Sequence, residues 1–182
     1  RRVRPAELMT VDIVFTIEAD AWDEILPGIE APAAHAARAA LDRVRVEADV
    51  LEVSIVLADD AFVADLNRRY RGKEGATNVF AFPQSAQSPG GVRLLGDVVL
   101  GHETVMAEAC AQSKRPEHHV CHLVVHGVLH LCGYDHETGA TARDMETLER
   151  EILASQSIAD PYRDDPSDPE APPPLSGQSI AP

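Results

Sequence analysis

Three histidines in the second half of the chain constrain the fold more than any other feature. His126 and His130 are four positions apart, and His136 follows after Gly133. Residues four apart lie on one face of a helix, so the first two imidazoles can reach a single point. Glycine accepts the left-handed conformation that ends many helices, so the chain can reverse at Gly133 and bring His136 to that point. The spacing therefore predicts a helix, a turn and a shared site.

Imidazoles gathered in this way are typical ligands of zinc. Three neutral imidazoles leave the fourth position of a tetrahedral zinc ion free for water, as in catalytic rather than structural sites. A histidine-rich helix without metal is the alternative, but this spacing with a glycine at the break disfavours it. The sequence predicts one Zn2+ per chain, with His126, His130 and His136 as its ligands.

One position of the same stretch departs from a known zinc-protease signature. The signature H-E-x-x-H-x-x-G-x-x-H matches everywhere except at Gly127, which stands where the signature has glutamate. That glutamate is the general base that deprotonates the metal-bound water, and glycine cannot replace it. Hydrolysis of a phosphodiester can rely on metal-bound hydroxide and charge stabilisation. The departure therefore favours a phosphodiester over a peptide as substrate.

Several segments of the chain resemble one protein family. They are residues 122–136, residues 66–73 with 77–83, and residues 95–100. These segments resemble the signature blocks of the YbeY family, which are bacterial metal-dependent endoribonucleases implicated in ribosomal RNA maturation and ribosome quality control. The resemblance implies a zinc ion on three histidines, a functional arginine at Arg71, and a role at the 3′ end of 16S ribosomal RNA. Ala81 stands where many members have serine, a departure that affects no metal ligand.

The chain is strongly acidic, which is unusual for a protein that binds nucleic acid. Its formal net charge is −14, whereas RNA affinity rests largely on cations that contact phosphate. The local exception is a cluster of four cations, Arg68, Arg69, Arg71 and Lys73. This cluster could form a basic rim beside the metal. An equally good alternative is that these cations lie at a solvated helix end, where they stabilise the C-terminus of the helix. The low cationic charge suggests a partner that supplies further affinity, such as components of the small ribosomal subunit.

Length and composition indicate one folded domain. A chain of 182 residues is long enough for one hydrophobic core and short for two. We expect the domain over residues 10–156, a flexible extension over 1–9, and a disordered acidic tail over 157–182. Residues 160–182 hold seven of the 13 prolines, and five acidic residues against one arginine. Met9 could be the true initiator.

The sequence shows no feature of a secreted or membrane protein. No apolar run approaches the ~18 residues that a membrane-spanning helix needs. No basic-then-apolar leader is visible, and three cysteines fit no disulfide framework. We therefore expect a cytoplasmic protein without a membrane partner.

The periodicity of apolar residues predicts an α+β fold. Alternating, β-branched segments predict about four strands, near residues 10–18, 51–57, 79–82 and 94–100. Apolar residues at helical spacing predict about five helices, near residues 33–47, 60–71, 102–112, 116–131 and 141–154. Pro116 suits the first position of the helix that carries the histidines. The expected architecture is a small mixed sheet packed with these helices, one of them a metal helix like that of the zinc proteases.

Three further residues are candidates for a supporting role. His122 is one turn before His126 and could be a fourth ligand, but helix drift carries it around the axis, so we expect it instead to support the site or face the substrate. Asp135 adjoins His136 and could accept the N–H of a ligand imidazole, and an ordinary turn carboxylate is the equal alternative. Asp97 is either structural or a similar support.

Three functions are compatible with these residues. The first is a zinc-dependent endoribonuclease that acts on single-stranded or ribosomal RNA rather than DNA, with Arg71 neutralising the phosphate or its transition state. The second is a metallopeptidase with a substitute base, which Gly127 disfavours. The third is a non-catalytic, zinc-stabilised module that binds ribosomal partners. The cations of residues 68–73 favour the first and the third, and we expect the first.

Overall fold

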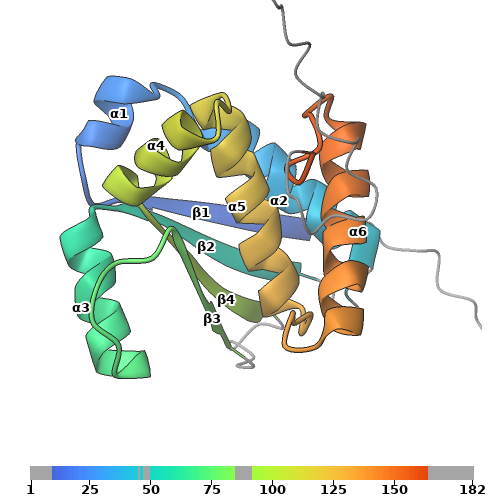
Figure 1. Ribbon diagram of the computed structural model, residues 1–182. Helices are drawn as coiled ribbons and strands as arrows, with labels where there is room; N and C mark the ends of the chain where they lie inside the picture. Colours follow the sequence, from blue (N-terminus) through green and yellow to red (C-terminus); the bar gives the residue numbers. More distant parts are fainter. Residues whose placement is uncertain (1–9, 45, 47–49, 85–91, 164–182) are drawn as a thin grey trace, which may run out of the picture.

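A four-stranded mixed sheet forms the centre of the molecule (Figure 1). The structure is a computed structural model that describes residues 10–44, 46, 50–84 and 92–163. The strands are β1 (Thr10–Ile17), β2 (Val50–Ala58), β3 (Val79–Pro83) and β4 (Val92–Gly101), in the order β1-β2-β4-β3. β1, β2 and β4 run parallel, and β3 pairs with β4 as an antiparallel edge strand. The predicted mixed sheet of about four strands is confirmed.

Six helices pack around this sheet within the described residues. They are α1 (Ala21–Ile25), α2 (Glu30–Val44), α3 (Asp60–Arg71), α4 (His102–Ala111), α5 (Pro116–Leu131) and α6 (Gly139–Ser155). The one helix that the sequence analysis missed is α1, because a single turn is too short to show a helical period. Trp22 anchors it, since its ring is fully buried and its Nε1–H donates to the Ala58 carbonyl over 2.9 Å.

The main core lies between the sheet and α2, α5 and α6. Alternate residues of β2 point into it, and Leu51, Val53, Ile55 and Leu57 are all fully buried. Helix α5 contributes Val124 and Val128, among others, to the same core. Figure 1 shows α5 between the sheet and α6, with α3 on the other side of the sheet. Helix α5, which carries two of the predicted metal ligands, is therefore held on both sides by packed elements.

A smaller apolar cluster lies beneath α3. It contains Ala58, Val63, Phe80 and Val99. Helix α3 is capped by Asp59, whose carboxylate accepts the Phe62 backbone N–H over 2.7 Å, and it ends at Arg71, before the left-handed Gly72. Its last residue, Arg71, thereby reaches the edge of the sheet formed by β3.

The described chain continues to Arg163, beyond residue 156 where we expect the domain to end. Ile158 packs against the main core, and Asp160 forms an ion pair of 3.3 Å with Arg150. The rest of the expected tail, residues 164–182, and the expected extension over 1–9 lie outside the described residues, as do residues 85–91. Among the helices that the structure describes, none is long and apolar enough to cross a membrane.

Candidate metal centre

Helix α5 presents its histidines at the surface of the core that it helps to form. It begins with Pro116 at its first position and ends at Leu131, as predicted. At Gly133, whose φ is +92°, the chain turns back, and the Tyr134 backbone N–H donates to the Leu129 carbonyl over 3.1 Å. This turn returns the chain towards α5, so His136 lies beside the helix that carries His126 and His130.

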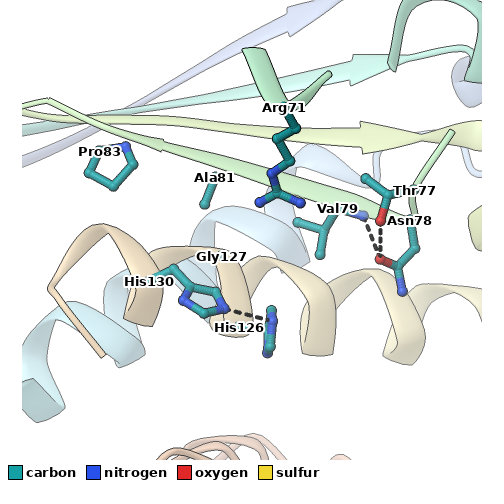
Figure 2. Close-up of a pocket in the computed structure, with 9 residues that line it drawn as sticks. All are labelled: Arg71, Thr77, Asn78, Val79, Ala81, Pro83, His126, Gly127 and His130. Carbon is teal, nitrogen blue, oxygen red and sulfur yellow. Dashed lines mark hydrogen bonds between the residues drawn. The ribbon is translucent and has the colours of Figure 1, made fainter. Parts of the chain in front are cut away.

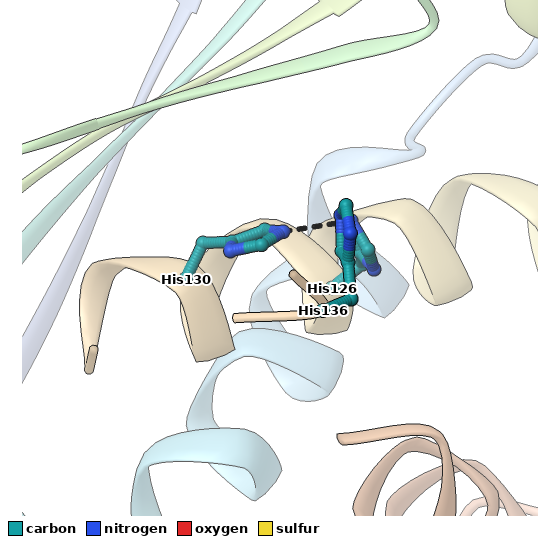
Figure 3. A group of neighbouring side chains, drawn as sticks. All are labelled: His126, His130 and His136. Atoms are coloured by element: carbon teal, nitrogen blue, oxygen red, sulfur yellow. Dashed lines mark hydrogen bonds between the residues drawn. The ribbon is translucent and has the colours of Figure 1, made fainter. Parts of the chain in front are cut away.

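The three predicted histidines meet at one point (Figure 3). One ring nitrogen from each of His126, His130 and His136 lies within 4.8 Å of the other two, and the Nε2 atoms of His126 and His130 are 3.0 Å apart. Tetrahedral zinc bonded to imidazole nitrogens at about 2.0–2.1 Å would separate those nitrogens by about 3.3 Å. The donor set therefore fits a single zinc-sized ion.

Two of the three imidazoles are oriented by hydrogen bonds at their Nδ1 atoms. The Nδ1–H of His126 donates to a Glu149 carboxylate oxygen over 2.8 Å, and the Nδ1–H of His130 donates to the Tyr134 carbonyl over 2.9 Å. These bonds leave the Nε2 lone pairs directed at the shared point. Burial, with the nearby His126, lowers the pKa of His130, which keeps that imidazole neutral.

Among the residues that the structure describes, Glu149 is the acidic residue that contacts a histidine of this group. It is fully buried in α6, and its second oxygen receives a hydrogen bond from His122 over 2.9 Å. Burial alone would raise the pKa of this carboxyl, but the hydrogen bonds from His122 and His126 lower it to about 2. The carboxylate is therefore ionised. Sequence reasoning missed Glu149 because only the packing of α6 on α5 brings it to His126.

The structure places the three supporting candidates differently. His122 lies beside the three histidines and contacts Glu149, so its expected supporting role stays a prediction. Asp135 is exposed and accepts the Glu137 backbone N–H over 3.1 Å, and among the described residues it has no hydrogen bond to a histidine. This agrees with the second of the two roles expected for Asp135, an ordinary turn carboxylate, and Glu149 is the carboxylate that contacts His126.

Asp97 faces away from the metal helix. The side chains of a strand alternate between its two faces, and Val98 is the residue of β4 that points at α5. Asp97 therefore points to the α3 side of the sheet, where its carboxylate accepts from Gln84 Nε2 over 2.9 Å. It has a structural contact there, which is one of the two roles expected for it, whereas the other, support of a metal ligand, does not fit this position.

A cavity of about 250 Å³ opens beside the histidines (Figure 2). Its lining residues are Arg71, Thr77, Asn78, Val79, Ala81, Pro83, His126, Gly127 and His130. Figure 2 shows the Arg71 side chain extending from the β3 side towards α5, opposite the two histidines. The guanidinium carbon lies 4.0 Å from the centre of the Phe80 ring, which supports it from one side.

The other cations of the expected basic cluster do not share this position. Arg68 and Arg69 both form ion pairs with Asp65, and the Arg69 pair measures 2.7 Å. Lys73 is exposed beyond the end of α3. Arg71 is therefore the member of the cluster that lines the cavity.

The sequence matches one family along most of its length. Residues 17–157 match the family model described as endoribonuclease YbeY. An endoribonuclease YbeY of Paramagnetospirillum magneticum is 47% identical over 159 residues, which cover 85% of this chain and 97% of that protein. One of Azorhizobium caulinodans is 48% identical over 157 residues, which cover 85% and 96%. The chain belongs to the endoribonuclease YbeY family.

Gly127 gives this member of the YbeY family a close contact between its metal helix and the sheet. A Cβ atom at this position would lie 2.6 Å from Cγ1 of Val98, so any larger residue would force Val98 or α5 to shift. Gly127 stands where a zinc protease carries its glutamate, and here the Val98 side chain fills the space beside it. Among the described residues that line the cavity, none carries a carboxylate.

Proposed function

We propose that this chain is a zinc-dependent endoribonuclease that cleaves single-stranded or ribosomal RNA in the cavity between α5 and β3. The observation that supports this most directly is the placement of Arg71 across that cavity from His126 and His130. A phosphodiester between these side chains would meet a fixed positive charge on one side and the three-histidine site on the other. Family membership supports RNA as the substrate.

The metal would be held by His126, His130 and His136. A bound zinc ion supplies Lewis-acid chemistry towards a phosphoryl oxygen and lowers the pKa of water. Two of these histidines are already oriented, because the Nδ1–H groups of His126 and His130 donate hydrogen bonds to Glu149 and to the Tyr134 carbonyl. The rings of His126 and His130 are therefore already oriented towards the shared point before an ion binds.

Arg71 would bind and stabilise the phosphate. A guanidinium group stays charged at all physiological pH values and can donate two parallel hydrogen bonds to phosphate oxygens. Contact with the Phe80 ring restricts the Arg71 side chain before the substrate arrives. A restrained cation that faces the developing negative charge favours the transition state over the ground state.

A metallopeptidase is the less favoured function for the same cavity. Such enzymes need a carboxylate that removes a proton from water, and the cavity has none among its described lining residues. Gly127 cannot be exchanged for glutamate without a shift of Val98 or α5, because Val98 lies against it. Phosphodiester hydrolysis, in which Arg71 stabilises the charge, makes better use of the residues present.

The cellular setting follows from the same proposal. We propose action in ribosomal RNA maturation, at the 3′ end of 16S ribosomal RNA, and in ribosome quality control. Components of the small ribosomal subunit would supply affinity that a chain with a net charge of −14 lacks. The corresponding location is the cytoplasm.

Cleavage of a defined single-stranded RNA tests the proposal. We expect internal cleavage by protein loaded with one equivalent of Zn2+, and loss of both bound zinc and cleavage in His130→Ala. His35→Ala is the matched control, because His35 is exposed on α2 and lies outside the three-histidine group. Full zinc retention by His130→Ala would show that the ligand set is wrong. Intact RNA in the presence of zinc-loaded protein would leave the non-catalytic module as the function, and cleavage of a peptide instead would indicate the peptidase.

A further inference from the structure

A buried network of side chains connects the metal centre to the segment that follows α6. Its centre is Glu149, which has no exposed surface. One carboxylate oxygen accepts from His126, and the other accepts from both His122 and the Tyr162 hydroxyl. Burial of a carboxylate is unfavourable unless donors replace the lost water. Three donors do so here, and one of them belongs to a predicted metal ligand.

Tyr162 is brought to this network by a series of contacts in residues 160–162. Asp160 forms an ion pair of 3.3 Å with Arg150 of α6, and its carboxylate also accepts the Tyr162 backbone N–H over 2.9 Å. Lys114 donates to the Pro161 carbonyl over 2.6 Å. The Arg150 guanidinium carbon lies 5.0 Å from the centre of the Tyr162 ring. The segment is thus attached to α6 and to the loop before α5.

The phenol acts as a hydrogen-bond donor in this position. Burial, together with the charge of Glu149, raises the pKa of the Tyr162 hydroxyl, so the group keeps its proton. Its hydrogen bond goes to the same Glu149 oxygen that His122 contacts at 2.9 Å. With that oxygen held by two donors, the carboxylate cannot rotate without losing both bonds, and its other oxygen stays opposite Nδ1 of His126.

We propose that Glu149 and Tyr162 are positioning residues of the metal centre. The Tyr162 hydroxyl holds the Glu149 carboxylate, which holds the His126 imidazole with its Nε2 directed at the point shared with His130 and His136. The inference rests on the proposed ligand set. It makes residues 160–162, which follow α6, a functional part of the site. Partners that orient a ligand imidazole typically contribute a factor of 10–100 to metal affinity.

A purely structural role is the competing explanation. The same contacts join α6 and residues 160–162 to α5, and their loss would then lower the stability of the fold alone. The two explanations differ in what happens to the metal. A positioning role changes the affinity and coordination geometry of the ion in folded protein, whereas a structural role leaves both unchanged and lowers the unfolding temperature.

Zn2+ affinity of three variants separates these explanations. Tyr162→Phe removes one hydroxyl and keeps the ring against Arg150, and Glu149→Gln removes the charge at nearly the same volume. We expect zinc affinity, measured by competition with a chromogenic chelator, to fall about 10-fold in Tyr162→Phe and towards 100-fold in Glu149→Gln. Glu151→Gln is the matched control, because Glu151 lies in the same helix, is exposed and pairs with Arg43. It should bind zinc as the unaltered protein does.

The spectrum of bound Co2+ provides a readout that a structural role would not change. Co2+ replaces zinc in tetrahedral sites, and its visible absorption reports the arrangement of the ligands. We expect altered absorption in Tyr162→Phe at a temperature where circular dichroism shows it folded. Unchanged affinity and spectrum in Tyr162→Phe would overturn the proposal even if Glu149→Gln fails to fold. These zinc and cobalt measurements contain no RNA, so they do not depend on the proposed nuclease activity, which the cleavage assay tests separately. An unaltered protein that binds no zinc would refute both the proposed function and the positioning role.

Discussion

Arg71 differs from the neighbouring cations in what surrounds its guanidinium group. Arg68 and Arg69 are both paired with Asp65, whereas Arg71 lies on the Phe80 ring and lines the cavity with the histidines. A cation in the last turn of a helix interacts favourably with the helix dipole whichever way its side chain points. One that is supported by an aromatic ring and directed into a cavity is placed to contact a ligand.

Replacement of Arg71 should therefore slow RNA cleavage without unfolding the protein. We expect Arg71→Ala to lose on the order of 3 kcal/mol of transition-state stabilisation, which is about a hundredfold in kcat/KM. Bound zinc and the thermal midpoint should stay unchanged. Arg71→Lys should recover part of the loss, because ammonium keeps the charge but not the paired donors. Arg69→Ala is the control, and a normal rate in Arg71→Ala would return this arginine to a helix-end role.

Zinc occupancy should depend on pH because the ligand imidazoles must be neutral. Burial lowers the pKa of His130 below the ordinary value of 6.5. The folded chain then binds fewer protons at this residue than the unfolded chain, so the contribution of neutral His130 to stability is complete above pH 6.5 and declines as the pH falls. Protons also compete with the metal for the ligand imidazoles, and this competition grows as the pH falls.

We expect full zinc occupancy at neutral pH and release in mild acid. The measurement is the zinc content of protein equilibrated at pH values from about 7.5 to about 4, and His35→Ala should follow the same curve. Occupancy that stays constant down to about pH 4 would point to ligands other than three histidines.

Helix α5 carries two of the three predicted metal ligands and packs closely against the sheet at Gly127. Gly127 lies between His126 and His130 in sequence, on the side of the helix that meets Val98 of β4. The distance between α5 and the sheet therefore sets the position of the histidines relative to Arg71. Close packing of this kind tolerates little added volume.

Gly127→Ala should destabilise the protein although alanine favours helices. The gain in helix propensity is about 1 kcal/mol, whereas overpacking costs about 1–3 kcal/mol. We expect a net loss of about 1 kcal/mol, seen as a lower thermal midpoint, together with slower RNA cleavage. Gly139→Ala is the matched control, because a Cβ there would meet only a side-chain atom of Arg143 at 3.5 Å.

A compensating change tests the physical reason for this loss. Val98→Ala removes the two γ-carbons that lie nearest to Gly127. The double variant should then be less destabilised than the sum of the two single changes, because the overlap no longer exists. Simple additivity of the two effects would show that the contact with Val98 is not the cause.

Most of the fold and the grouping of the three histidines could be predicted from local sequence signals, and the residues proposed to support them could not. The strands and long helices follow from periodicity, and Gly133 indicates the turn that brings His136 to α5. Glu149 and Tyr162 carry no such signal, because 23 residues separate Glu149 from His126 along the chain. Adjacency in sequence suggested Asp135 instead, which the turn leaves exposed. Tertiary packing alone decides which carboxylate reaches a ligand.

The charge of the chain as a whole determines how RNA binding should respond to salt. The net charge is −14, and two arginines of the basic cluster are already paired with Asp65. Arg71 and Lys73 are then the cations of that cluster left for phosphate. Each contact between a cation and the phosphate of single-stranded RNA adds about −0.7 to the slope of log K against log salt.

We therefore expect a shallow slope of about −1.4 for a short single-stranded RNA, measured by fluorescence anisotropy over a range of KCl concentrations. Lys73→Ala should reduce its magnitude by about 0.7, because one phosphate contact is lost. Arg43→Ala removes a cation that pairs with Glu151 on the far side of α6 from Glu149, and it should leave the slope unchanged. A slope steeper than about −3 would require more phosphate contacts than this cluster provides. RNA would then be held by a wider surface, and the chain would have less need of a ribosomal partner to supply affinity.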